Sequence, residues 1–229
     1  MRVLGIDTTT KVLSIGVYDG IKTFEYNIDL GTKHAILLTP AIKRILDTLK
    51  WRVEDIDYLA CGVGPGSFTG IRVGLATIEG LAWALNLPLI GLETLDLLAS
   101  NAKEESGIVV PIVDAKRNMV YACIYQTGAN GLKKKSPYLL ITMDELIKKI
   151  KAFGYKTKLI FLGDAIGLYK ERLISELGEV VFLDKDCWYP KGHNIIEQAL
   201  MKIKNKKISN AFNIKPIYLY PKECQIRKP

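Results

Sequence analysis

The sequence predicts an α/β protein in which a partly parallel sheet is flanked by helices, and three observations carry this prediction. Strand-like apolar runs alternate with helical apolar patterns through the first hundred residues, which is typical of sheets with helices on their faces. A glycine loop that begins at Gly62 follows the apolar run Tyr58 to Cys61 and leads into a long helical pattern. The second half opens, like the first, with a strand, a polar turn and another strand, so we expect two related domains.

The first half opens with a buried strand that ends at Asp7, a polar turn from Thr8 to Lys11 and a second strand, which together predict a hairpin. Asp19-Gly20 is a strong turn signal before a third, alternating strand. Apolar residues at three- and four-residue spacing then indicate helices, and Ser67 or Thr69 can cap the second of them. The expected elements are strands 3–7, 12–18, 22–29, 58–61 and 88–91, and helices 33–50, 67–86 and 93–102.

Ser106-Gly107 is the expected domain boundary, which gives domains 1–105 and 106–229, with the last strand and the tail able to return to the first domain. As in the first half, an acidic residue, here Asp114, ends the opening strand. The expected elements of the second half are strands 108–114, 120–126, 159–162, 180–183 and 216–220, helices 143–153, 168–177 and 195–206, and a basic tail 221–229.

The glycine loop does not match the phosphate-binding or nucleophile motifs that it superficially suggests. A P-loop requires lysine after its last glycine, and Ile71 follows Gly70 here. A dinucleotide-binding fingerprint requires a third glycine where this chain has Ser67. The spacing around Ser67 is not Gly-x-Ser-x-Gly either, so it is not a nucleophile elbow.

The helix 67–86 is apolar on nearly all sides, because Arg72 and Glu79 are its only charged residues between Phe68 and Leu85. Glycine inside a helix costs about 1 kcal/mol relative to alanine, so the two rows of small residues in this helix need an explanation. The usual explanation is that another backbone packs closely against the small residues. The rows are Gly66, Gly70 and Gly74, and Ala76, Gly80 and Ala84. Either the helix lies inside a large α/β core, or a second protein covers the side that faces away from the sheet.

Composition and charge bound the possible partners. The net charge is +8, from 10 Lys and Arg against 13 Asp and Glu in residues 1–110, and 22 against 11 in residues 111–229. The basic half could contact nucleic acid, or it could be a solvated lysine-rich surface. The four scattered cysteines form no Cys-x-x-Cys pair, and the N-terminus reads as a strand rather than a signal peptide. No apolar run is long enough to span a membrane, so we expect a cytoplasmic protein.

Several segments in this order closely resemble the bacterial TsaB (YeaZ) family. They are Gly5-Ile-Asp-Thr-Thr9, His34 with Leu37, Leu38 and Pro40, Gly64-Pro-Gly-Ser-Phe-Thr-Gly-Ile-Arg72, Asp114 with Arg117 and Tyr121, and Pro216-Ile-Tyr-Leu219. The resemblance spans almost the whole chain, and the Gly64–Arg72 segment is highly specific. It implies an actin/hexokinase-like (ASKHA) fold of two related domains with mixed sheets flanked by helices.

The resemblance also implies a function in making N6-threonylcarbamoyladenosine (t6A) at position 37 of tRNAs that read codons beginning with A. It implies that the chain is not the transferase but the non-catalytic partner of a TsaD-like protein, which a TsaE-like ATPase joins. ATP and metal would be used by these partner proteins, tRNA would bind the assembled complex, and the chain alone would form a homodimer.

In that family a bundle of two helices from each protein forms the contact, and here these helices are 33–50 and 67–86. The expected contact residues are His34, Leu37, Leu38, Ala41, Ile45, Phe68, Ile71, Arg72, Leu75, Ile78 and Glu79. We expect Ile71→Arg or Leu75→Arg to abolish pairing and to leave the monomer folded.

The chain lacks the residues that the catalytic relative would need. A His-x-x-x-His metal site is absent because Leu38 follows His34 at that spacing, and His193 is far along the chain; metal catalysis needs about three protein ligands. We therefore expect no catalytic residues, no metal site and no cofactor of its own. Asp7, Thr8 and Thr9 resemble the first phosphate-binding loop of the actin/hexokinase superfamily, and they are the candidate nucleotide ligands. The alternative function is therefore that of an independent small-molecule kinase of this superfamily.

Overall fold

The computed structural model describes residues 1–29, 31, 33–128, 131–154 and 157–221, and these fall into two compact units. Unit 1 comprises Met1–Leu97 together with Pro190–Ile217, and unit 2 comprises Leu98–Tyr189 together with the chain from Tyr218. The boundary expected at residue 105 therefore lies earlier. The last helix belongs to unit 1 rather than to the second domain, because the chain returns to the first sheet at Pro190 and leaves it again after Ile217.

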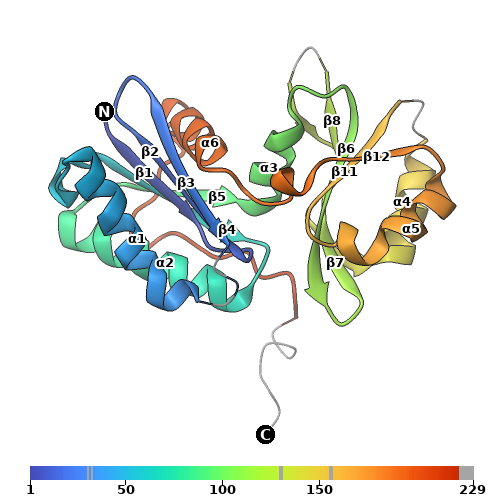
Figure 1. Ribbon diagram of the computed structural model, residues 1–229, viewed down its shortest axis with the longest axis horizontal. Coiled ribbons are helices and arrows are strands. Elements are labelled where there is room, and N and C mark those ends of the chain that lie inside the picture. Colours follow the sequence, from blue (N-terminus) through green and yellow to red (C-terminus); the bar gives the residue numbers. More distant parts are fainter. Residues whose placement is uncertain (30, 32, 129–130, 155–156, 222–229) are drawn as a thin grey trace, which may run out of the picture. The chain divides into compact units, whose positions relative to one another are not determined.

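Unit 1 is built on a mixed sheet of five strands in the order β3-β2-β1-β4-β5 (Figure 1). β1 pairs antiparallel with β2 and parallel with β4, β2 pairs antiparallel with β3, and β4 pairs parallel with β5. The strands are β1 (Val3–Asp7), β2 (Val12–Tyr18), β3 (Thr23–Asp29), β4 (Tyr58–Gly64) and β5 (Leu89–Glu93). β1 is buried on both faces, whereas the edge strand β3 alternates between exposed and half-buried residues, which is why only β3 shows an alternating sequence.

Helices cover both faces of this sheet (Figure 1). α1 (His34–Leu49) and α2 (Phe68–Leu85) lie on one face, and α6 (Gly192–Lys204) packs on the other. Ser67 caps α2 by accepting a hydrogen bond from the Gly70 N–H, as the sequence predicts. α6 begins three residues before its apolar pattern because β3 caps it: Asn27 Oδ1 accepts from the Gly192 N–H at 3.3 Å and Glu25 Oε2 from the His193 N–H at 3.1 Å.

The sheet of unit 2 repeats the strand order and directions of unit 1, in the order β10-β7-β6-β11-β12. Its path strands are β6 (Gly107–Lys116), β7 (Met119–Ala122), β10 (Leu139–Thr142), β11 (Leu159–Leu162) and β12 (Val180–Phe182), and β8 (Tyr125–Thr127) and β9 (Lys133–Lys134) extend it. α4 (Met143–Phe153) and α5 (Ile166–Leu177) follow β10 and β11 as α1 and α2 follow β3 and β4. The predicted organisation of two related domains with mixed sheets flanked by helices is thereby confirmed.

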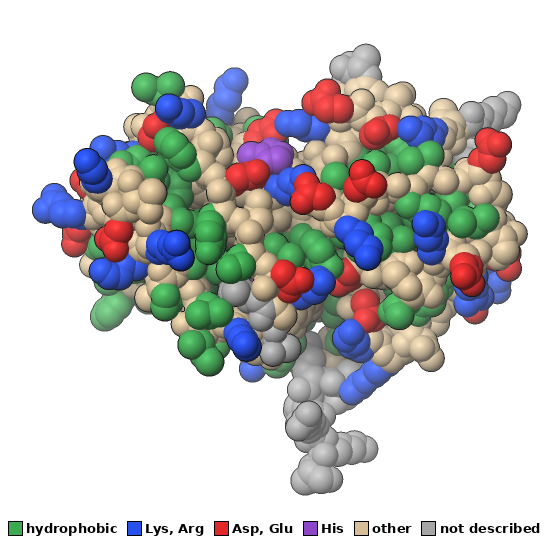
Figure 2. Space-filling view, viewed as in Figure 1, with side chains coloured by type: hydrophobic (Ala, Val, Ile, Leu, Met, Phe, Trp, Pro, Cys, Tyr) green, Lys and Arg blue, Asp and Glu red, His purple; other side chains and the backbone are tan. Residues whose placement is uncertain are grey.

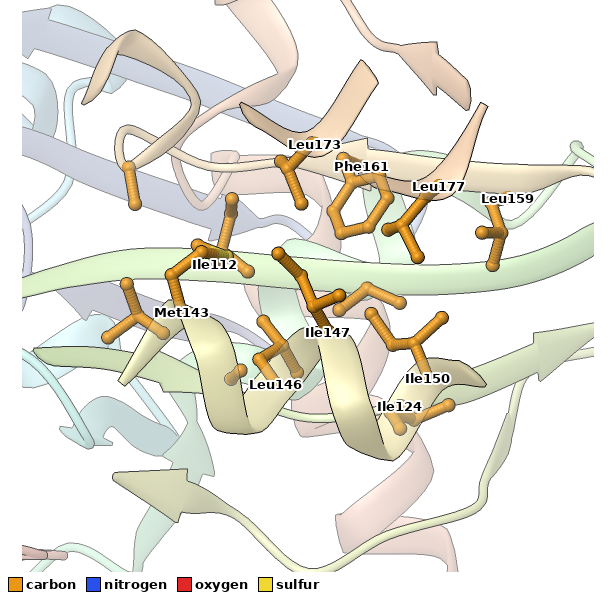
Figure 3. Close-up of a cluster of buried hydrophobic side chains, with 14 of the residues drawn as sticks. Ile112, Ile124, Met143, Leu146, Ile147, Ile150, Leu159, Phe161, Leu173 and Leu177 are labelled. Carbon is orange, nitrogen blue, oxygen red and sulfur yellow. The ribbon is translucent and has the colours of Figure 1, made fainter. Parts of the chain in front are cut away.

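A contiguous apolar core holds unit 2 together (Figure 3). Leu146, Ile147 and Ile150 project from α4 toward side chains of β6 and β11 such as Ile112 and Phe161. The apolar residues of α4 recur at helical spacing, so one stripe is buried while its lysines face outward.

Two strand predictions are wrong. The single strand expected over residues 120–126 is two strands, because the chain breaks between Ala122 and Tyr125 to pair first with β10 and then with β9. The terminal strand expected over residues 216–220 is not a strand, although the Ile217 N–H donates a backbone hydrogen bond to the Val63 carbonyl at 2.8 Å. Short 3-10 turns cover Val53–Asp55, Ser100–Ala102 and Lys185–Cys187, and α3 (Thr94–Ala99) is shorter than expected. Most of the expected basic tail, residues 222–229, lies outside the described residues.

Candidate functional site

The turn between β1 and β2 is closed by its own hydrogen bonds. Asp7, Thr8 and Thr9 are at most 1% exposed. Asp7 Oδ1 accepts from the Thr9 N–H at 2.9 Å and from the Thr9 hydroxyl at 2.8 Å, and the Thr94 hydroxyl lies 3.4 Å from Asp7 Oδ2. The Thr8 hydroxyl donates to the Gly70 carbonyl at 2.7 Å. The polar atoms of this turn therefore bind one another and α2.

The first row of glycines explains how α2 reaches this turn. A methyl group on Gly66 would overlap the Thr9 carbonyl oxygen, and one on Gly70 would overlap the Thr8 carbonyl oxygen. The Ser67 N–H also donates to the Thr9 carbonyl at 2.7 Å. Only glycine lets two backbones come this close. The row Gly66, Gly70 and Gly74 is thus required by a contact within the chain and not by a partner helix.

This geometry argues against Asp7, Thr8 and Thr9 as nucleotide ligands. A phosphate needs free backbone or hydroxyl donors that it can approach, and α2 covers those of the turn. Burial raises the pKa of Asp7 to about 6, although hydrogen bonds from Thr9 and Thr94 lower it in part. The carboxyl group is accordingly a buried structural group of unit 1, which the sequence pattern of the family's first loop did not reveal.

The predicted contact residues divide between the core and the surface. Leu38, Ile71, Leu75 and Ile78 are at most 5% exposed, so the structure places them in the core of unit 1 and not on the open surface where the sequence prediction put them. The reason is that α1 and α2 lay these residues on their own sheet. Ile71→Arg or Leu75→Arg would therefore bury an uncompensated charge and unfold the monomer, contrary to the expectation from sequence.

His34 is also mostly buried and ties the start of α1 to the first turn. Its side chain is 6% exposed, and Nε2 lies 2.8 Å from the Thr10 carbonyl oxygen. This position explains a histidine at the beginning of the helix without any metal or partner. Among the residues that the structure describes, no cluster of three or more His, Cys, Asp and Glu side chains is placed to hold a metal ion.

The side of α1 and α2 that faces away from the sheet remains open. Of the predicted contact residues, Leu37 and Arg72 are exposed, and Ala41, Ile45, Phe68 and Glu79 are half-buried. The Arg72 guanidinium lies 3.8 Å from the centre of the Phe68 ring. Burial raises the pKa of Glu79. These residues are therefore placed where a partner could reach them.

Further residues complete this open side. Ile36 is 74% exposed, Trp83 is 70% exposed, and Ala76, Gly80 and Ala84 are exposed. A methyl group added to Gly80 would meet nothing within 4 Å, so no contact within the chain explains that glycine. We call Ile36, Leu37, Ala41, Arg72, Ala76, Gly80 and Trp83 the helix-pair face. Its second small-residue row was visible in the sequence, but Trp83 carried no signal that distinguished it from a core residue.

The corresponding hairpin of unit 2 is also internally bonded. Asp164 Oδ1 accepts from the Asp114 N–H at 2.9 Å, and Asp114 Oδ1 accepts from the Lys116 N–H at 2.8 Å. Lys116, Arg117 and Asn118 all have left-handed backbone angles, with φ of 64°, 53° and 58°. The turn thus lacks the glycines that would allow a phosphate to approach the backbone closely.

None of the helices in the described part of the chain is both long and apolar enough to cross a membrane.

Comparisons with known proteins agree with this architecture. The family model described as TsaD, tRNA N6-adenosine threonylcarbamoyltransferase, matches residues 29–214. The chain is 37% identical over 226 residues to the tRNA threonylcarbamoyladenosine biosynthesis protein TsaB of Haemophilus influenzae, which covers 96% of this chain and 93% of that protein. It is 27% identical over 229 residues to TsaB of Bacillus subtilis, covering 99% of this chain and 97% of that protein. A solved structure of YeaZ from Pseudomonas aeruginosa has the same fold, with a TM-score of 0.82 at 24% identity, covering 95% and 99% of the two chains.

Proposed function

The chain belongs to the TsaB (YeaZ) family of tRNA threonylcarbamoyladenosine biosynthesis proteins, and we propose that within this pathway it is the non-catalytic subunit that pairs with a TsaD-like transferase. The observation that carries the proposal is the helix-pair face. It exposes Ile36 and Leu37 in the first turn of α1, and Ala76, Gly80 and Trp83 along the second half of α2. Large apolar side chains that are exposed on one side of a helix pair are typical of protein contacts, and the small residues of α2 allow a partner helix to approach closely.

The remaining parts of the proposal follow from the family resemblance. The pair recruits a TsaE-like ATPase and transfers a threonylcarbamoyl group to N6 of adenosine 37 in tRNAs that read codons beginning with A. ATP and metal are bound by the partner proteins, and the reaction takes place in the cytoplasm. In the absence of the TsaD-like protein, the same face joins two copies of this chain.

An independent small-molecule kinase is the weaker candidate. Such an enzyme would have to bind the phosphates of its nucleotide at the first turn, and Asp7, Thr8 and Thr9 are enclosed by α2. The pairing proposal requires no chemistry from these residues.

Gly80→Arg is expected to weaken pairing with the TsaD-like protein at least about 100-fold, because a charge would be buried without a partner in the contact. The same variant is expected to be monomeric when alone. Pairing is measured by titration calorimetry with the organism's own TsaD-like protein, and oligomeric state by light scattering.

Gly167→Arg is the matched control, since Gly167 is an exposed helical glycine of α5 with open space around it. We expect this variant to pair normally. A threonylcarbamoyl-transfer assay on unmodified tRNA should require both proteins. Normal pairing by Gly80→Arg would refute the location of the contact, and phosphate transfer by the pure chain would favour the kinase.

A further inference from the structure

Much of the basic excess of the second half belongs to unit 1. Residues 190–217 carry six lysines against one glutamate, and they return to the first sheet. Three of these lysines, Lys204, Lys206 and Lys207, are exposed where α6 ends. Figure 2 shows basic side chains spread over the visible surface among acidic and hydrophobic ones. Several lysines without an acidic partner among the described residues, in one short segment, therefore differ from this general distribution. We call residues 201–213 the α6 exit segment.

The lysines of the α6 exit segment differ in their partners. Lys202 Nζ is committed to unit 1, with Glu93 Oε2 at 2.6 Å and the Gly91 carbonyl oxygen at 2.7 Å. Within the ranges that the structure describes, no ion pair is formed by Lys204, Lys206 or Lys207. Lys204 lies in the last turn of α6, where a cation is favoured by the helix dipole. Lys206 and Lys207 lie beyond the helix, so that explanation does not cover them.

The same segment also carries exposed apolar side chains. Phe212 is 80% exposed, Met201 is 52% exposed and Ile208 is 40% exposed. The turn that carries Phe212 is hydrogen-bonded, because Asn210 Oδ1 accepts from the Phe212 N–H at 2.9 Å and from the Asn213 N–H at 3.1 Å. An ordered turn therefore exposes an aromatic ring to solvent, in the same short segment of chain as the three lysines.

The α6 exit segment is anchored firmly to the sheet. Ser209 and Leu89 of β5 exchange two backbone hydrogen bonds, at 2.8 and 3.1 Å. α6 lies on the face of this sheet opposite α1 and α2 (Figure 1). A ligand on the α6 exit segment and a protein on the helix-pair face would thus occupy different parts of unit 1.

We propose that the α6 exit segment is an RNA contact of the tRNA-modifying complex, in which Lys204, Lys206 and Lys207 bind phosphates and Phe212 stacks on an unpaired base. The proposal rests on the proposed function for the presence of tRNA. Cations that follow a sugar–phosphate backbone, together with an exposed aromatic ring, are how proteins bind single-stranded and looped RNA. An acidic protein surface would satisfy the lysines but would give Phe212 no planar base to stack on.

Lys206→Glu with Lys207→Glu is expected to weaken tRNA binding by the purified complex at least tenfold. The slope of log affinity against log salt should fall by about 1.5, since about 0.7 to 0.9 counterions are released per contacted phosphate. Phe212→Ala is expected to weaken binding about tenfold with an unchanged salt slope, because stacking is not ionic. Fluorescence anisotropy with unmodified tRNA at several salt concentrations measures both.

The matched control is Lys148→Glu with Lys149→Glu, an adjacent pair of exposed lysines on α4. This variant makes the same change in net charge and should bind tRNA nearly as tightly as the wild type. Equal losses in the two double variants would overturn the proposal by showing a non-specific charge effect. Unchanged tRNA binding in Lys206→Glu with Lys207→Glu, accompanied by lost binding to the TsaD-like protein or to phosphatidylglycerol vesicles, would overturn it in favour of an acidic protein or a lipid surface.

Chromatography of each protein mixture without RNA separates the two proposals. If the wild-type chain does not pair with the TsaD-like protein, the proposed function fails. If all variants pair normally and the tRNA affinities do not differ, only the RNA contact fails.

Discussion

Gly70→Ala is expected to destabilise unit 1 by about 3 kcal/mol or more. The added methyl group would overlap the Thr8 carbonyl oxygen and would crowd the Ser67 side chain. Overpacking a core costs about 1 to 3 kcal/mol even where side chains can give way, and here the obstacle is backbone. The shift would also break the 2.7 Å hydrogen bond from the Thr8 hydroxyl to the Gly70 carbonyl. Urea denaturation followed by circular dichroism measures the loss.

Gly80→Ala is the matched control for Gly70→Ala, in the same helix. A methyl group at Gly80 meets nothing within 4 Å, so the variant should gain up to about 1 kcal/mol from the higher helix propensity of alanine. A similar change in the free energy of unfolding for both variants would contradict the assignment of one glycine to an internal contact and the other to the open surface.

Asp7→Asn is expected to stabilise the chain by about 3 kcal/mol above pH 6 and to have little effect near pH 4. The structure accommodates the amide, because its oxygen can accept from Thr9 as the carboxylate does and its NH2 group can donate to the Thr94 hydroxyl. The gain arises because the variant removes a buried charge that the wild type must carry at neutral pH.

The direction of this pH dependence follows from the pKa of Asp7. Burial raises that pKa from 3.8 to about 6, so the folded state favours the protonated form. The stability that the protonated form contributes is complete below pH 3.8 and is lost as the pH rises through 6. A difference of about two pKa units corresponds to about 3 kcal/mol.

The measurement is the free energy of unfolding of wild type and Asp7→Asn at half-unit steps from pH 4 to pH 8. Asp47→Asn, on the exposed side of α1, is the control and should follow the wild-type profile. If Asp7→Asn were less stable than wild type at pH 7.5, Asp7 would not be the buried, protonation-favouring group that the geometry indicates.

Much of the fold was predictable because local sequence patterns determine it. α4 has the bounds that the sequence predicted, and in the structure Thr142 and Glu145 form a capping box at its start and Gly154 ends it. The repeated strand–turn–strand opening also predicted the duplicated sheets, which share one strand order. In both cases residues close in sequence carry the whole signal.

Other elements depend on residues far away in sequence and were therefore predicted wrongly. α6 begins at Gly192 because Glu25 and Asn27, on a distant strand, cap its first N–H groups. The sequence near residue 192 contains no information about those capping residues, so the start of the helix could not be predicted from it. The terminal segment is similar, since Ile217 donates its backbone hydrogen bond to Val63, which is far away in sequence.

The candidate site shows the same division between local and distant information. The sequence by itself determined the α/β class, the family resemblance and the presence of two small-residue rows on an apolar helix. A helix that is apolar on all sides gives no indication of which side packs on the sheet, because residues far away in sequence determine which side is buried. Only the tertiary structure decided that the row containing Gly70 packs on Thr8 and Thr9, that Ile71 and Leu75 lie in the core, and that Gly80 and Trp83 remain open to a partner.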